Sequence, residues 1–440
     1  MKFTSTRDPD REAGVSEALE AGLAPDGGLF VPTTLPRFDA GAFRPDISLP
    51  ECAAQVLAPF FDGSVLAERL GTICGAALDL ELPVNPLESI ESLETAGRGA
   101  PAWMMELFHG PTAAFKDFAA RFLARSLGAL RSESSPPRTV LVATSGDTGA
   151  AVAAAFYRQP GFRVVILYPE GRVSGRQAHQ LGAFGDNVQT FRVEGSFDDC
   201  QRLAKQALGD PRMVERHGLT SANSISIGRL LPQISYYALA TVRVAASGPL
   251  DVIVPTGNLG NALACILARD MGFPIRRVYL ATNANRTLPD YFAGADYRGR
   301  AGLRTLANAM DVGDPSNFER LAWFYRDTNP RDAGIHAESI EDDAIKSCIQ
   351  REYERHGNIV CPHTACALEL LSRLRADGHR QPTLVAATAH PAKFESVIEP
   401  IIGHQIPLPP ALEELLQRPS HADPLAADLD VLERALAAGG

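Results

Sequence analysis

A series of short apolar runs constrains the fold of this chain more than any other feature. Helix-like segments separate the runs, which cover residues 103–108, 139–143, 164–168, 188–193, 251–254, 278–281 and 383–387. Because the runs are continuous and do not alternate with polar residues, each predicts a strand that is buried on both faces. Buried strands that alternate with helices form parallel sheets covered by helices. The sequence therefore predicts an α/β fold from residue 100 onwards.

The chain divides into three predicted regions. Residues 1–92 contain short helical pieces interrupted by proline and glycine, and predict a mostly helical N-terminal domain with a turn and a short strand at 22–32. Residues 91–100 are the expected connection to the region of the predicted strands, 93–405. Residues 406–440 are expected to form a helical tail, with outer helices at 411–417 and 423–438.

The charge of the chain argues against several classes of partner. The 440 residues carry a net charge of −10, and no block of Lys and Arg with interleaved aromatic residues is present. This composition argues against binding to nucleic acid or to an anionic membrane. The apolar runs are far shorter than the ~20 residues of a membrane span, and residues 1–12 lack the apolar core of a secretory signal. We therefore expect a cytoplasmic protein that does not cross a membrane.

The seven cysteines do not suggest a disulfide framework. Their odd number and scattered positions are typical of reduced core residues. Cys361 and Cys366 bracket His363, but this spacing fits no usual zinc pattern and no second pair of ligands is present. We therefore expect no metal site.

Lys116 lies in an unusual setting for a lysine. Residues 109–120 place it at the start of an expected helix, among small and aromatic residues. A cation there faces the positive end of the helix dipole, and apolar neighbours disfavour its charged form, so its pKa should be lowered. A lysine with a lowered pKa acts as an amine nucleophile or a base. The alternative is an ordinary surface lysine that pairs with Asp117 in solvent.

Two glycine-rich turns each link an expected strand to an expected helix. The first contains Ser145, Asp147 and Thr148, and the second covers residues 257–261. The free N–H groups of such a turn point at one place, and the glycines of the second turn let the backbone approach an anion closely. Neither turn matches a dinucleotide or P-loop fingerprint. The alternative is that each turn only caps its helix.

A third polar cluster, at 223–229, precedes an apolar helix expected at 230–244. Its members Asn223, Ser224 and Arg229 combine a guanidinium fork, which matches a phosphate, with short neutral hydrogen-bonding groups. The alternative is that Ser226 caps the helix and Arg229 lies on the surface. The same two alternatives stand for Arg172, just after the strand expected at 164–168: it binds a phosphate, or it lies on the surface.

With these residues, the chain resembles the threonine synthases, which are pyridoxal-phosphate (PLP) enzymes of the tryptophan-synthase β-like fold (PLP fold type II). The resemblance is to their longer variety with an N-terminal domain, and it runs nearly end to end. It rests on segments that occur in this order: 5–7, 22–32, the Lys116 segment, 143–149, 168–174, 223–229, 258–261 and 388–394. The resemblance implies two α/β lobes with parallel sheets within 93–405, with the cofactor between them.

The resemblance also implies a role for each motif. Lys116 carries PLP as a Schiff base, Thr388 meets the pyridine nitrogen, and Asp147 lies near the 3′-oxygen of the cofactor. A neutral hydroxyl at the pyridine nitrogen moderates the electron sink. The backbone of the second turn holds the cofactor phosphate, through Gly257, Asn258, Leu259, Gly260 and Asn261. The candidates for binding the substrate phosphate are Ser145, Thr148, Arg172, Asn223, Ser224 and Arg229.

The implied activity is the last step of threonine biosynthesis. A monomer converts O-phospho-L-homoserine and water to L-threonine and phosphate, by γ-elimination followed by β-addition. Asp147 stands where many relatives with this fold have Asn, although the longer threonine synthases resemble this chain in having Asp, and the protonation of the 3′-oxygen stays open. His390 is either a catalytic acid or, as we favour, a histidine that packs in a loop.

Four other readings stay open, the weakest of which is a phosphate-binding transferase that does not use PLP. The first two are a related PLP-dependent β-eliminating lyase or dehydratase and a phospho-lyase that releases a keto acid. The cluster at 223–229 argues against a substrate without phosphate. The third is a non-catalytic, metabolite-binding relative, and Lys116 argues against it because a pure binder does not need an amine there.

Overall fold

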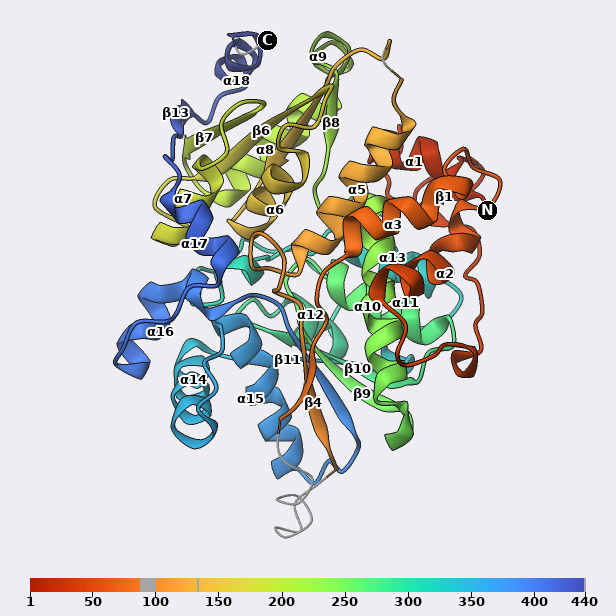
Figure 1. The fold of residues 1–440 in the computed structure, drawn as a ribbon, viewed down its shortest axis with the longest axis vertical. Helices are drawn as coiled ribbons and strands as arrows, with labels where there is room; N and C mark the ends of the chain where they lie inside the picture. Colours follow the sequence, from red (N-terminus) through yellow and green to blue (C-terminus); the bar gives the residue numbers. More distant parts are fainter. Residues whose placement is uncertain (88–99, 133, 439–440) are drawn as a thin grey trace.

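The strands predicted in the sequence form two sheets, one in each lobe (Figure 1). The computed structural model describes residues 1–87, 100–132 and 134–438. The larger sheet has six strands in the order β11-β10-β9-β12-β4-β3 and is parallel except for β3, which runs antiparallel to β4. Its strands are β3 (Val84–Pro86), β4 (Ala102–Glu106), β9 (Leu250–Pro255), β10 (Ile275–Thr282), β11 (Ile335–Ser339) and β12 (Thr383–Ala387).

The smaller sheet has five strands in the order β13-β7-β6-β5-β8 and is parallel throughout. Its strands are β5 (Arg138–Ala143), β6 (Phe162–Pro169), β7 (Val188–Glu194), β8 (Leu219–Ser221) and β13 (Asp423–Ala426). The chain crosses from the larger to the smaller sheet through helix α5 (Lys116–Leu130) and returns through α10 (Ile227–Arg243). Both helices therefore begin where one lobe ends.

Because the central strands are buried on both faces, their sequences do not alternate between apolar and polar residues. In β9, Val252 and Val254 pack with residues of α10 and α11, whereas Ile253 packs with residues of α14 and α15 on the other face. In β5, Val140 and Leu141 divide in the same way between two clusters.

The remaining helices of the two lobes are α6 (Asp147–Phe156), α7 (Gly175–Gly182), α8 (Phe197–Gly209), α9 (Pro211–His217), α11 (Gly260–Asp270), α12 (Thr287–Phe292), α13 (Phe318–Phe324), α14 (Asp342–His356), α15 (Pro362–Ala376) and α16 (Glu395–Ile402).

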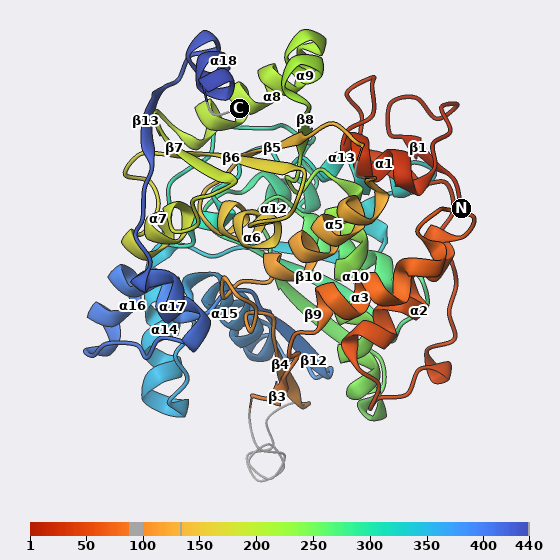
Figure 2. The same ribbon diagram turned by 45° about the horizontal axis from the view of Figure 1, so that its top comes forward.

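The N-terminal region packs on the two crossing helices. It contains an antiparallel ribbon of β1 (Phe3–Ser5) and β2 (Phe30–Pro32), and the helices α1 (Val15–Ala21), α2 (Leu49–Phe61) and α3 (Leu70–Leu78). In Figure 2 these helices lie beside α5 and α10, which they contact. The strand expected at the end of 22–32 is confirmed as β2. The predicted boundary between 92 and 93, and residues 91–99 of the expected connection, lie outside the described residues.

The C-terminal tail differs from its prediction. Helix α17 (Pro410–Gln417) matches the first expected helix, but the second, α18 (Leu429–Ala438), begins later than expected because β13 comes first. This strand pairs in parallel with β7 at the edge of the five-stranded sheet. Only Leu425 of the strand is buried, so its sequence lacks the apolar run that marked the central strands. Among the helices of the described residues, none has the length and apolarity needed to cross a membrane.

Arg320 joins the N-terminal region to the site-bearing loops. Its side chain is fully buried in α13 and donates hydrogen bonds to the carbonyl oxygen of Phe30 (3.0 Å), to Oδ1 of Asn317 (2.8 Å) and to the carbonyl oxygen of Ile225 (2.6 Å). One guanidinium therefore holds β2, α13 and the segment before α10 together.

Arg320→Ala should destabilise the fold. The change leaves two buried carbonyl groups without a donor, at a cost of about 3 kcal/mol. We expect the thermal unfolding midpoint, followed by circular dichroism, to fall by several degrees, and that of the exposed control Arg298→Ala to stay at the wild-type value. Equal midpoints for the two variants would contradict the role given to Arg320.

Candidate active site

Lys116 is the first residue of α5, as the sequence predicts. The segment before it runs along the carboxyl end of β12, where the N–H of Leu107 donates to the carbonyl oxygen of Ala387 (2.9 Å) and the N–H of Phe115 donates to that of Thr388 (2.9 Å). These backbone contacts place the lysine beside Thr388, where β12 ends.

The surroundings of Lys116 make its ammonium group easier to deprotonate than that of an ordinary lysine. Its side chain is only 14% exposed, and its Nζ lies 3.8 Å from Oδ2 of Asp147. Burial lowers the pKa of Lys116 to about 8, although Asp147 opposes the shift. The alternative pairing with Asp117 in solvent is wrong, because Asp117 is buried and accepts hydrogen bonds from the backbone N–H (2.9 Å) and the hydroxyl (2.6 Å) of Thr112.

Asp147 begins α6 and is also buried. Its Oδ1 lies 2.9 Å from Nζ of Lys393 and accepts a hydrogen bond from the side-chain amide of Gln177 (3.0 Å). Burial alone would raise the pKa of Asp147, but the charges of Lys393 and Lys116 outweigh it and hold the pKa well below its usual range. The carboxylate therefore stays ionised between two lysines.

The second glycine-rich turn lies between β9 and α11. No side chain caps α11, and within the described residues no backbone N–H from Gly257 to Asn261 donates to an acceptor. Leu259 adopts a left-handed conformation, with φ 63°. A Cβ on Gly257 would lie 2.7 Å from Cα of Met310, so the backbone needs glycine there. Free donors at a helix N-terminus are the arrangement that suits an anion.

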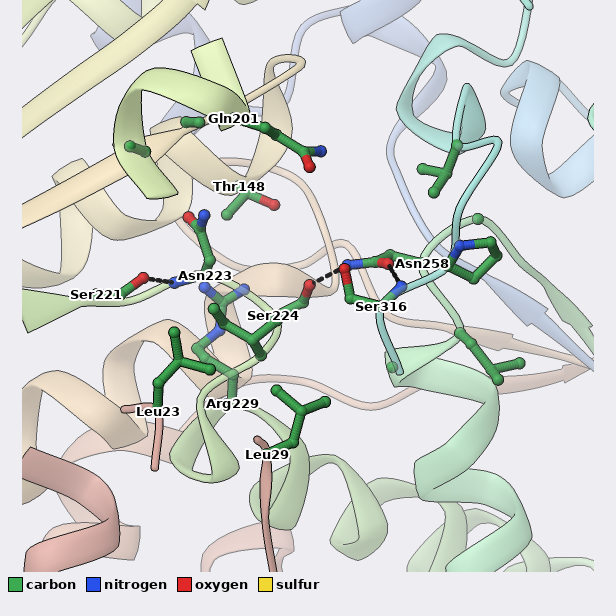
Figure 3. Close-up of a pocket in the computed structure, with 18 of the residues that line it drawn as sticks. Leu23, Leu29, Thr148, Gln201, Ser221, Asn223, Ser224, Arg229, Asn258 and Ser316 are labelled. Atoms are coloured by element: carbon green, nitrogen blue, oxygen red, sulfur yellow. Dashed lines mark hydrogen bonds between the residues drawn. The ribbon is translucent and has the colours of Figure 1, made fainter. Parts of the chain in front are cut away.

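The two asparagines of this turn fix it to its neighbours. Figure 3 shows the Asn258 side chain between Ser224 and Ser316: its Nδ2 donates to Oγ of Ser224 (2.6 Å), and its Oδ1 accepts from the N–H of Ser316 (2.6 Å). Oδ1 of Asn261 accepts from the hydroxyls of Tyr236 (2.6 Å) and Tyr237 (2.9 Å). The hydrogen bonds of both side chains therefore fix the position of the turn.

Arg229 lies in the first turn of α10 and is buried, not on the surface. Its Nη1 donates to the carbonyl oxygen of Ala222 (2.6 Å), whereas its Nε has no partner in the described residues. Burial lowers the pKa of Arg229 to about 10, so it remains a cation at neutral pH. Ser226 precedes the helix without capping it through its side chain.

One cavity of about 970 Å³ brings these groups together. Figure 3 shows Thr148, Asn223, Ser224 and Arg229 on its wall, with Leu23 and Leu29 of the N-terminal region nearby. All but one of the predicted site residues line it, namely Lys116, Ser145, Asp147, Thr148, Asn223, Ser224, Arg229, Gly257, Asn258, Leu259, Gly260, Asn261 and Thr388.

Arg172 is the exception. It is exposed in the turn after β6 and is not among the residues that line the cavity. The residue before it, Gly171, has a left-handed φ of 66°. His390 packs against Phe108 with ring centroids 5.4 Å apart, and its Nδ1 accepts from the N–H of Ala392 (3.2 Å). This packing favours the structural reading of His390.

Comparison with known proteins supplies the family. The family of pyridoxal-phosphate dependent enzymes matches residues 79–389, the threonine synthase N terminus matches 2–78 and the threonine synthase C-terminal family matches 364–436. Threonine synthase of Haemophilus influenzae is 36% identical over 97% of both chains. The chain belongs to the threonine synthase family. The crystal structure of threonine synthase from Escherichia coli covers both chains fully with a TM-score of 0.91 and 35% identity, and that of PLP-bound threonine synthase from Brucella melitensis has a TM-score of 0.88 and 32% identity over 99% and 98% of the chains.

Membership of this family confirms the predicted PLP fold type II and the predicted cofactor. The site fits PLP, because the cavity combines an amine of lowered pKa at Lys116 with the free N–H groups of 257–261, which suit a phosphate. Thr388 offers a hydroxyl where β12 ends. No group of His, Cys, Asp or Glu among the described residues could hold a metal ion.

Sequence reasoning missed Lys393, Gln177 and His363. Lys393 and Gln177 contact Asp147, and His363 lines the cavity while its Nε2 accepts from the N–H of Ala309 (3.1 Å). Burial lowers the pKa of His363 to about 4, so the ring is neutral. Lys393 lies in the segment 388–394 that carried the family resemblance, which was the one signal available.

Gly257→Ala should weaken binding of the cofactor in this threonine synthase family member. The added methyl group meets the backbone of Met310 and shifts the turn at a cost of about 1–3 kcal/mol, so the dissociation constant for PLP should rise roughly five- to hundredfold. A titration of the apoenzyme with PLP, followed by absorbance, measures the change. In the control Gly71→Ala the new Cβ meets nothing within 4 Å, and its affinity should match that of the wild type.

Proposed function

We propose that this chain converts O-phospho-L-homoserine and water to L-threonine and phosphate. The observation that carries the proposal is the presence of two separate anion-binding groups on one cavity with Lys116. The turn at 257–261 provides one, and buried Arg229 with its unpaired Nε provides the other. A cofactor phosphate occupies the first, which leaves the second for a substrate that also carries a phosphate.

The cofactor side of the site uses the predicted residues. Lys116 Nζ would form the covalent attachment, the N–H groups of 257–261 would hold the phosphate, Thr388 would meet the pyridine nitrogen, and Asp147 would face the 3′-oxygen. When bound, PLP supplies an electron sink for carbanions at the substrate. Binding of the substrate would free the Lys116 amine. This amine would then move protons at Cα and Cβ of the substrate, a task that suits a pKa of about 8.

The substrate side uses the polar groups at the start of α6 and α10. Asn223, Ser224 and Arg229 bind the substrate phosphate, and Ser145 and Thr148 add hydroxyl groups from the facing wall. Arg172 is left out of the proposal because it lies outside the cavity. The apolar side chains of Leu23 and Leu29 exclude water from this end.

We also propose that the protein works as a cytoplasmic monomer. All seven cysteines are buried and free, which suits a reducing compartment. The division into 1–92, 93–405 and the tail stays a prediction, as does the absence of nucleic-acid binding.

Assay of both products tests the proposed reaction. Purified protein with PLP and O-phospho-L-homoserine should release threonine and phosphate in equal amounts. Lys116→Ala should abolish both and remove the absorption band of the bound cofactor. Phosphate with a keto acid in place of threonine would support the phospho-lyase alternative, and a colourless wild type without turnover would support a binding protein.

Arg229→Ala should raise KM for O-phospho-L-homoserine while the cofactor band persists. Loss of a charge-assisted contact to phosphate corresponds to about 1.5–3 kcal/mol, or roughly a ten- to hundredfold rise. Arg212, which is 92% exposed, provides the matched control, and Arg212→Ala should keep the wild-type KM. An unchanged KM in Arg229→Ala would remove Arg229 from the substrate site.

A further inference from the structure

A second lysine is buried beside the reactive one. Lys393 is fully buried, and its Nζ lies 2.9 Å from Oδ1 of Asp147 and donates to the carbonyl oxygen of Thr112 at 2.6 Å. Lys393 belongs to the 3₁₀ helix η6 (Pro391–Phe394), which follows the six-stranded sheet, whereas Asp147 begins α6 of the five-stranded lobe. The ion pair therefore joins the two lobes beside the cavity.

The two oxygens of Asp147 face different partners. Oδ1 contacts Lys393 and the amide of Gln177, whereas Oδ2 lies 3.8 Å from Nζ of Lys116, beyond hydrogen-bond distance. In the part of the chain that the structure describes, no group accepts a hydrogen bond from Nζ of Lys116. The carboxylate thus makes its close contact with the second lysine and only a longer ion pair with the reactive one.

None of the other ionisable groups around Lys116 takes over the role of Lys393 in balancing the charge of Asp147. Arg229 approaches from α10 and adds positive charge, and His363 approaches from α15 as a neutral ring. The second buried carboxyl group, Asp117, is engaged with Thr112 and faces Lys393 and Arg229. If residue 393 were apolar, Lys116 would become the main cationic partner of Asp147.

We propose that Lys393 is a positioning residue for the reaction. By holding Oδ1 and balancing its charge, Lys393 keeps the Asp147 carboxylate in place and prevents it from capturing the Lys116 ammonium in a closed ion pair. The ion pair with Lys393 also explains how a buried aspartate can stand at position 147. Lys393 balances the negative charge of the aspartate, a charge that an asparagine there would not have. The inference rests on the proposed attachment of the cofactor to Lys116.

The test follows how fast the full-length, cofactor-free protein gains its absorption band with limiting PLP, as a function of pH. Only the neutral amine reacts, so the wild-type rate should rise with pH to a midpoint near 8. In Lys393→Met the midpoint should move up by about one pH unit, so the rate at pH 7 should fall about tenfold. Asp147→Asn should move the midpoint down, and the double variant should return it towards the wild-type value.

Controls separate this role from a general loss of folding. Lys346→Met removes an exposed lysine and should keep the wild-type midpoint. If Lys393→Met does not fold, the double variant decides: a folded protein with a midpoint near 8 supports the charge pairing, and a double variant that fails as the single one does overturns it. A folded Lys393→Met with an unchanged midpoint also overturns the inference. Capture of PLP by Lys116→Ala as a stable band would instead overturn the proposed attachment.

Discussion

An excess of buried positive charge is the constraint on which the rest of the site depends. Lys116 and Arg229 line the cavity, Lys393 is buried next to Asp147, and Asp147 is the carboxylate that forms ion pairs with both lysines. Burial of cations without partners is costly, so such a cluster persists where anions complete it. The helix N-termini at 147, 227 and 260 add further partial positive charge. A cavity with this potential suits ligands that carry phosphate groups, as both PLP and a phosphorylated substrate do.

The crossing of the chain between its sheets delivers these charges to one place. Lys116 opens α5 where the chain leaves the six-stranded sheet, and Arg229 lies in the first turn of α10 where the chain leaves the five-stranded one. The two glycine-rich turns follow β5 and β9, at the carboxyl ends of parallel strands. Ligands of parallel sheets bind at these ends because the turns there present uncapped helix N-termini. The position of the site is thus a consequence of topology.

The central elements could be predicted from sequence because their signals are local. A strand buried on both faces must be apolar throughout, and the run at 383–387 coincides with β12. The edge strand β13 has one neighbour and one buried residue, Leu425, so it carries no such run. The partners of Asp147 escaped prediction for another reason: both are distant from it in sequence. Packing within the five-stranded lobe brings Gln177 of α7 to the carboxylate, and packing of the two lobes brings Lys393 there. The sequence also could not show that Arg172 lies exposed in a turn, away from the residues that line the cavity.

The N-terminal region is better understood as a wall of the site than as an appended domain. Leu23 and Leu29 line the cavity, and Arg320 fastens the strand β2 to the segment that leads into α10. Asn317, which accepts from Arg320, also donates to the carbonyl oxygen of Asn258 in the phosphate-binding turn (3.0 Å). The same chain of hydrogen bonds therefore reaches from the N-terminal ribbon to the turn at 257–261 and to the backbone of Ser224 and Ile225 before α10. A rigid connection of this kind would hold the two proposed phosphate sites at a fixed separation, which a reaction on a substrate attached between them requires.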